Sequence, residues 1–110
     1  MIKNVLLCIL FSANFLIAEV IIDVRTSKEF QSGHLENSIN IEWQDILSIS
    51  SNIEKSKKIY LYCRSGNRSQ KATEILSQAG FLNGENVGSI TQASEQLKVK
   101  IKKKVEDKSY

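Results

Sequence analysis

The order of apolar and polar residues along the chain predicts short strands that alternate with helices. Residues 20–24 and 59–62 are almost continuously apolar, which is typical of strands buried on both faces. Apolar side chains recur at helical spacing from Ala72 to Ala79, and Gly80 then stands where a left-handed helix C-cap belongs. Weaker patterns predict an extended segment over 38–41, a helical turn over 43–47, a strand over 86–88 and a helix over 90–98.

A capping motif marks the first helix of the predicted domain. Thr26 and Glu29 have the Thr-x-x-Glu spacing of a capping box, so a short helix is expected to begin there and to end near Gly33. Strands that alternate with helices imply parallel pairing and a sheet covered by helices on both faces. The sequence therefore predicts an α/β fold with a short parallel β-sheet, whose chemistry gathers at the carboxyl ends of the strands.

The first 18 residues have the pattern of a secretory signal peptide. Lys3 precedes a mostly apolar run over 5–17, and Ala18 is a small residue suited to cleavage before Glu19. The run is too short to span the roughly 30 Å core of a bilayer as a helix. Leu16 stands where a second small residue is usual, so a membrane-tethered form that escapes cleavage stays open. An N-terminal core helix is a separate interpretation of the same residues. We expect export to the periplasm.

Length and charge divide the remainder into one domain and a tail. A chain of 110 residues has room for a single domain, placed here over 19–97. That stretch carries a net charge of −2, whereas residues 98–110 hold six lysines against two acidic residues, a net charge of +4. Such a tail could contact nucleic acid or an anionic membrane. Because it lacks arginine and has one aromatic residue, a solvated C-terminus without a nucleic-acid partner is expected.

Cys63 is the one cysteine that would remain in the exported domain. Cys8 lies inside the apolar run and would leave with the signal peptide. Exported proteins usually oxidise their thiols in pairs, so a cysteine without an intramolecular partner is a candidate reactive group. Cys63 also follows a predicted strand and precedes a predicted helix, which is where parallel sheets place their chemistry. We therefore predict that Cys63 is a nucleophile.

The six residues after Cys63 have the composition of an anion-binding loop; they are Arg64, Ser65, Gly66, Asn67, Arg68 and Ser69. Gly66 and Asn67 tolerate positive φ, so the backbone can curl with its N–H groups facing inward. The N-terminus of the next helix and the two arginines would add positive potential. Comparable settings lower the pKa of cysteine to roughly 3.5–7.5. The loop is therefore expected to hold an ionised thiol together with an outer sulfur atom or a sulfur oxyanion.

Short motifs follow one another in a fixed order through the chain. They are Ile22-Asp23-Val24-Arg25, Glu29-Phe30, Gly33-His34-Leu35, Ser38-Ile39-Asn40-Ile41, Tyr62-Cys63-Arg64-Ser65-Gly66-Asn67-Arg68-Ser69, Ala79-Gly80-Phe81 and Asn86-Val87-Gly88. With these motifs the chain resembles the single-domain rhodanese family, and within it the periplasmic phage-shock protein E type, from about Val20 to Ile90. The resemblance implies a rhodanese α/β sandwich and ping-pong transfer of a sulfane sulfur through a Cys63 persulfide. It further implies thiosulfate or a similar small donor, a thiol or other thiophilic acceptor, and no separate cofactor.

Two departures from the family pattern bear on substrate preference. The family often has a Gly-Gly pair where this chain has Gly88-Ser89, and the tryptophan that frequently follows is replaced by Thr91-Gln92-Ala93. These positions border the pocket or help to close the fold in the family. The sequence therefore leaves open which donor the site prefers.

Four further residues near the predicted site have structural or catalytic interpretations. Asp23 and Arg25 share one face of the first strand near its carboxyl end. The resemblance suggests a structural role for them, and we hypothesise that Arg25 pairs with Glu29 and holds the first helix to the sheet. His34, the only histidine, could form a Cys–His dyad. Because the loop already favours the thiolate, a structural role in a turn is expected for His34.

Competing interpretations remain for the same loop. Cysteine phosphatases and arsenate reductases usually place an arginine after five intervening residues, whereas four residues separate Cys63 from Arg68. The shorter loop favours a sulfur atom over a tetrahedral oxyanion. A non-catalytic module that carries sulfur or docks on a partner protein also fits the sequence. A metal site is not expected, because one histidine and one cysteine without close spacing fall short of a zinc ligand set. We also expect the protein to be a monomer.

Overall fold

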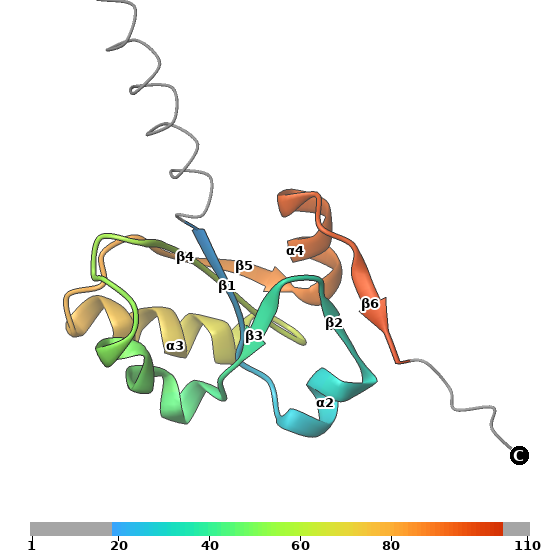
Figure 1. Ribbon diagram of the computed structural model, residues 1–110, viewed down its shortest axis with the longest axis horizontal. Helices are drawn as coiled ribbons and strands as arrows, with labels where there is room; N and C mark the ends of the chain where they lie inside the picture. Colours follow the sequence, from blue (N-terminus) through green and yellow to red (C-terminus); the bar gives the residue numbers. More distant parts are fainter. Residues whose placement is uncertain (1–18, 105–110) are drawn as a thin grey trace, which may run out of the picture.

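The computed structural model describes residues 19–104, so the predicted signal peptide lies outside the described residues. Within this range the centre of the fold is a sheet of four parallel strands in the order β3-β1-β4-β5 (Figure 1). The strands are β1 (Glu19–Asp23), β3 (Ser38–Asn40), β4 (Lys58–Cys63) and β5 (Gly84–Ser89). The central strands β1 and β4 are the segments with the strongest apolar pattern. The expected α/β fold with a short parallel sheet is therefore confirmed.

Helical segments connect the strands and cover the sheet. They are α2 (Ser27–Ser32), the 3-10 helix η2 (Trp43–Ser51), α3 (Asn67–Gln78) and α4 (Ile90–Leu97). α3 and η2 cover one face of the sheet and α4 covers the other (Figure 1). Thr26 and Glu29 form the expected capping box at the start of α2, and Ser89 and Gln92 form another at the start of α4. Between residues 19 and 104, no helix has the length and apolar composition that crossing a membrane requires.

The side chains of the central strands alternate between two apolar clusters. Ile22 and Leu61 point toward α3 and η2, whereas Tyr60 and Tyr62 point toward α4. The first cluster consists of Ile22, Val24, Ile46, Ile49, Ile59, Leu61, Ala72, Leu76 and Phe81, together with Cys63. Because both faces of the sheet are covered, the strands appear almost continuously apolar in the sequence. The packing of this first cluster holds Cys63 in a defined position.

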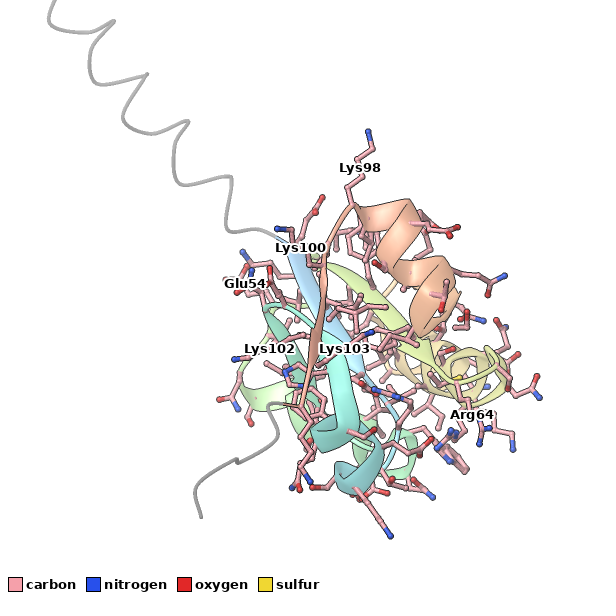
Figure 2. All side chains as sticks on the ribbon, turned by 90° about the vertical axis from the view of Figure 1, so that its right-hand side faces the viewer. Glu54, Arg64, Lys98, Lys100, Lys102 and Lys103 are labelled. Atoms are coloured by element: carbon pink, nitrogen blue, oxygen red, sulfur yellow. The ribbon has the colours of Figure 1, made fainter. Side chains whose placement is uncertain are left out.

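The second face is completed by an antiparallel pair that the sequence pattern does not predict. β2 (Gly33–Leu35) pairs with β6 (Ile101–Lys103). Val99 and Ile101 pack against the second cluster, which consists of Leu35, Tyr62, Val87 and Ala93. The expectation of a solvated tail from residue 98 onward is therefore wrong for residues 99–103, whose partner strand lies far away in the sequence. Exposed lysines run along this segment (Figure 2); they are Lys98, Lys100, Lys102 and Lys103.

Replacing Ile101 with alanine is expected to lower the free energy of unfolding by about 1–2 kcal/mol, because the half-buried side chain packs against the second cluster. Urea denaturation followed by circular dichroism measures the change. The neighbouring Lys102 is exposed on the same strand, so Lys102→Ala is the matched control and is expected to change stability by less than about 0.5 kcal/mol. Equal effects of the two substitutions would contradict the packing of β6 against the sheet.

Candidate active site

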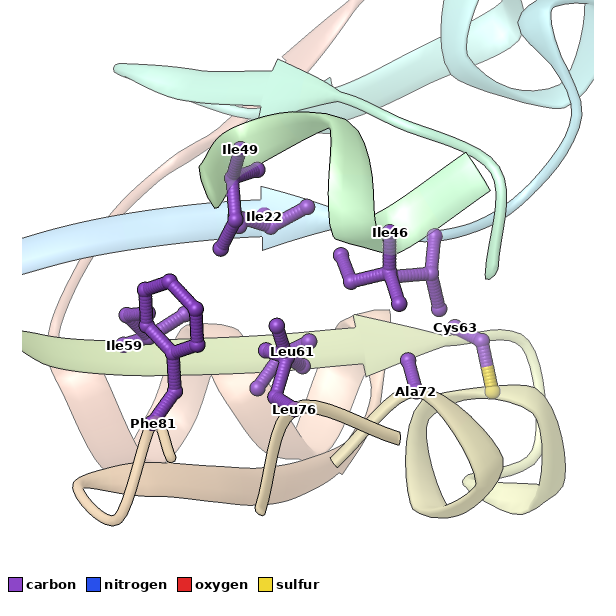
Figure 3. Close-up of a cluster of buried hydrophobic side chains, with 10 residues drawn as sticks. Ile22, Ile46, Ile49, Ile59, Leu61, Cys63, Ala72, Leu76 and Phe81 are labelled. Carbon is purple, nitrogen blue, oxygen red and sulfur yellow. The ribbon is translucent and has the colours of Figure 1, made fainter. Parts of the chain in front are cut away.

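Cys63 is the last residue of β4, and the fold places it at the carboxyl end of the sheet between β1 and β5. Its side chain belongs to the first apolar cluster, and its sulfur points toward the loop and the start of α3 (Figure 3). The residue is fully buried, with 0% of its surface exposed. The expected position of Cys63, between a strand and a helix, is confirmed.

The loop after Cys63 turns sharply at Gly66. Gly66 has a φ of +92°, a left-handed conformation that favours glycine, and it is the N-cap of α3. Its N–H donates to the sulfur of Cys63 at 3.0 Å. Asn67, in contrast, is the first residue of the helix and does not adopt the positive φ that this residue type tolerates. One left-handed residue is therefore sufficient to turn the backbone around the sulfur.

Ser69 and Asn86 form a polar network beside the sulfur. The hydroxyl of Ser69 lies 3.3 Å from Cys63 Sγ and donates to Asn86 Oδ1 at 2.7 Å. The orientation of the Asn86 amide is fixed, because its oxygen accepts from the Gly88 N–H and its nitrogen donates to the Gly66 carbonyl, both at 3.0 Å. Asn86 thereby ties β5 to the loop that surrounds the sulfur.

The contact of Asn86 with this site is not predicted from the sequence, which places Asn86 only in a short strand motif. β5 carries an irregularity here, because Leu61 is opposite Asn86 whereas Cys63 is opposite Ser89. A bulge of this kind re-aims the side chains beside it, which brings Asn86 to the loop. The signal that could have identified Asn86 is an amide side chain in a short strand, two positions before a glycine.

Hydrogen bonds around the sulfur lower the pKa of Cys63 below its usual value. Burial by itself raises this pKa, since it penalises the charged thiolate. The hydroxyl of Ser69 and the N–H groups of Ser69, Ser65 and Gly66 outweigh that penalty, because they donate to the charged form. The direction agrees with the prediction, and the groups with the largest effect are neutral donors, while Arg68 also interacts with the charge of Cys63.

The two arginines of the loop have different surroundings. Arg68 forms a two-point ion pair with Glu29 of α2, in which the Nη1–Oε1 distance is 2.7 Å and the Nη2–Oε2 distance is 3.0 Å. Arg64 extends into solvent from the loop (Figure 2) and has no ion pair within the described range 19–104. The charge of Arg68 is therefore compensated, whereas the charge of Arg64 is not.

The hypothesis that Arg25 pairs with Glu29 is wrong. Arg25 binds Asp23 instead, donating from Nε to Oδ1 at 2.9 Å and from Nη2 to Oδ2 at 2.6 Å. Nη2 also donates to the Gly33 carbonyl at 2.6 Å, which links the end of β1 to the start of β2. Asp23 and Arg25 lie two residues apart on one face of an extended chain, so their side chains meet before either reaches α2.

His34 lies away from the hydrogen bonds around Cys63. It stacks on Phe30 with the ring centroids 3.7 Å apart, and its Nδ1 lies 2.8 Å from the Phe30 carbonyl oxygen. A hollow of about 290 Å³ beside this stack is lined by Phe30, Gln31, His34, Lys102, Lys103 and Lys104, and so is separate from the cysteine. Across residues 19–104 the structure therefore contains neither a Cys–His dyad nor a group of three potential metal ligands.

Comparisons with known proteins agree with this geometry. The Rhodanese-like domain family matches residues 12–98. The chain is 34% identical over 86 residues to the thiosulfate sulfurtransferase PspE of Escherichia coli K12, covering 76% of this chain and 83% of that protein. It is 35% identical over 88 residues to the adenylyltransferase and sulfurtransferase UBA4 of Lodderomyces elongisporus, covering 70% of this chain but only 19% of UBA4. A solved structure described as a rhodanese with anions from E. coli has a TM-score of 0.69 at 30% identity, over 78% of this chain and 99% of that one.

Proposed function

The chain belongs to the rhodanese-like domain family, and from this premise we propose that it is an exported thiosulfate sulfurtransferase of the periplasm, carrying sulfur as a persulfide on Cys63. The observation that carries the proposal is the arrangement around the buried sulfur of Cys63, where the Gly66 N–H donates at 3.0 Å and the Ser69 hydroxyl lies at 3.3 Å, and these groups lower the pKa of the thiol. A thiol of lowered pKa ionises more readily near neutral pH and is a better leaving group. Similarity to PspE, which is named a thiosulfate sulfurtransferase, supports the choice of donor.

The proposed reaction has two balanced steps. In the first step the Cys63 thiolate attacks the outer sulfur of thiosulfate, the S–S bond of thiosulfate breaks, and sulfite leaves with the bonding electron pair. Cys63 then holds the outer sulfur as a persulfide anion. In the second step an acceptor thiolate attacks that outer sulfur, and Cys63 leaves again as a thiolate. Neither step needs an external oxidant or reductant.

The loop supports both forms of the sulfur. The N–H of Gly66 already contacts the Cys63 sulfur, and a curl of N–H groups that stabilises a thiolate also suits the negative outer sulfur of a persulfide. Because 0% of the Cys63 surface is exposed, the loop has to open before a donor reaches the sulfur. Opening of the loop is therefore part of the proposed cycle.

Intact-protein mass spectrometry tests the proposal. The purified protein is incubated with thiosulfate, and a gain of one sulfur atom is expected in the natural chain and not in Cys63→Ser. Dithiothreitol is expected to remove the added sulfur. The same spectrum shows whether the chain begins at Glu19, as cleavage of the predicted signal peptide requires. If the natural protein gains no sulfur although iodoacetamide modifies Cys63, the sulfurtransferase proposal is overturned.

A non-catalytic role as a sulfur carrier is the second candidate. It is favoured by the complete burial of Cys63 and by the similarity to UBA4, which is named both an adenylyltransferase and a sulfurtransferase. A carrier would load one sulfur but would transfer sulfur slowly from thiosulfate to cyanide or to a thiol. Comparing persulfide formed per protein with the steady-state rate separates the two roles. Hydrolysis of an aryl phosphate by the same sample tests the phosphatase alternative.

A further inference from the structure

The ion pair between Glu29 and Arg68 compensates one of the two positive charges of the loop. Glu29 is held from two sides, because Oε1 accepts from the N–H and the hydroxyl of Thr26 at 3.1 and 3.0 Å while both carboxylate oxygens accept from Arg68. These contacts lower the pKa of Glu29 to about 2, and the hydrogen bond from Arg68 is the largest cause. The carboxylate therefore stays ionised and in place at neutral pH.

The other charges near the sulfur leave one uncompensated cation in the loop. Asp23 and Arg25 are buried and paired with each other. The side chains of Arg68 and Glu29 are 29% and 30% exposed, so solvent reaches this pair, and Arg68 is near enough to Cys63 for their charges to interact. Of residues 64–69, only Arg64 carries a charge without an acidic partner in the part of the chain that the structure describes.

We propose that Glu29 weakens the preference of the Cys63 site for doubly charged over singly charged sulfur donors. A dianion such as thiosulfate is attracted by Arg64 but is repelled by the carboxylate beside Arg68, so it gains less than it would from two free guanidinium groups. A monoanionic thiosulfonate is repelled less by the same carboxylate. The inference rests on the proposed function in naming sulfur donors, and it specifies how the charge of a donor affects its reaction at the site.

Both classes of donor react through the same step. The Cys63 thiolate takes the outer sulfur, and the bonding electron pair leaves with sulfite from thiosulfate or with a sulfinate from a thiosulfonate. The product on the protein is the same persulfide. A change in the ratio of the two rates between variants therefore reports the charge at the site.

Alkylation of Cys63 by reagents of different charge tests the proposal. Glu29→Gln removes the carboxylate charge and keeps the helix cap, since glutamine also completes a capping box. Iodoacetate is an anion and iodoacetamide is neutral, so the ratio of their rates cancels any change in the fraction of thiolate. At low ionic strength this ratio is expected to rise about three- to tenfold in Glu29→Gln, and high salt is expected to reduce the difference. Peptide mass spectrometry confirms that the adduct is on Cys63.

A second carboxylate provides the matched control. Glu85 forms a comparable surface ion pair with Lys58 near the amino end of β5, and Glu85→Gln is expected to leave the ratio unchanged. An unchanged ratio in Glu29→Gln overturns the proposal. Because alkylation needs no sulfur transfer, a failure to form a persulfide would overturn the proposed function alone. In a protein that does form a persulfide, thiosulfate compared with methanethiosulfonate is expected to show the same shift.

Discussion

Replacing Arg25 with methionine is expected to lower the free energy of unfolding by about 3–5 kcal/mol. Asp23 is fully buried at the end of β1, and the guanidinium of Arg25 donates to both of its carboxylate oxygens. Methionine has a similar length but neither the charge nor the donors, so the substitution leaves a buried carboxylate without its counter-charge. It also removes the bond to the Gly33 carbonyl that joins β1 to β2. Urea denaturation measures the loss.

Two further variants separate the buried pair from a general effect of substitution. Lys28→Met removes a charge from an exposed position in α2 and is expected to change stability by less than about 0.5 kcal/mol. Adding Asp23→Leu to Arg25→Met removes the unpaired carboxylate and is expected to restore much of the lost stability. If Arg25→Met costs no more than Lys28→Met, the buried pair does not stabilise this end of the sheet.

Replacing Ser69 with alanine is expected to raise the pKa of Cys63 and to slow persulfide formation several-fold at pH values below that pKa. Burial opposes ionisation of Cys63, and the hydroxyl of Ser69 is the largest of the groups that favour it. Removing a donor to the thiolate disfavours the charged form, so the pH–rate profile for iodoacetamide moves to higher pH. Well above both pKa values the two proteins are expected to react at similar rates.

Ser65 provides the matched control for this substitution. It favours the thiolate through its backbone N–H, which Ser65→Ala retains, and its exposed side chain makes no hydrogen bond within the described range. Ser65→Ala is therefore expected to leave the profile in place, and Ser69→Thr is expected to preserve it by keeping a hydroxyl. Equal shifts in Ser65→Ala and Ser69→Ala would show that the hydroxyl is not responsible.

The single proton of the Ser69 hydroxyl limits how far its loss can raise the pKa of Cys63. A hydroxyl donates one hydrogen bond at a time, and Ser69 donates to Asn86 Oδ1 at 2.7 Å. When Cys63 ionises, the hydroxyl has to turn from Asn86 to the sulfur, 3.3 Å away. The gain at the sulfur is therefore partly offset by the loss at Asn86.

Most elements of the fold were predictable because their signals are local. The capping box of α2 and the left-handed Gly80, with a φ of +97°, each depend on a few neighbouring residues. β2 and β6, in contrast, are each stabilised by pairing with a strand that is distant in the sequence. The η2 helix also extends to Ser51, beyond the predicted turn over 43–47. Long-range pairing is what the sequence pattern could not show.

The features of the candidate site also separate into those that local sequence predicts and those that depend on long-range contacts. The position of Cys63 after a strand and the left-handed turn at Gly66 follow from adjacent residues. The partner of Glu29 does not, since several elements had to be placed before Arg68 could be distinguished from Arg25 as that partner. Ser89, which departs from the family pattern, has a role that depends on neighbouring residues only. Its side chain caps α4 by accepting from the Gln92 N–H.

The pairing of β2 with β6 has a consequence for the order in which the domain folds. Closing a loop between segments so far apart costs more conformational entropy than joining nearby ones, so we expect β6 to dock last. Until then β2 presents an unpaired edge, which is a site for aggregation between nascent chains. Lys102 and Lys103 lie in β6 and Lys100 immediately precedes it. Repulsion between these lysines and those of a second molecule opposes pairing of β6 strands from two chains. The lysines of β6 and its flank are thus expected to reduce aggregation of the partly folded domain until β6 pairs with β2.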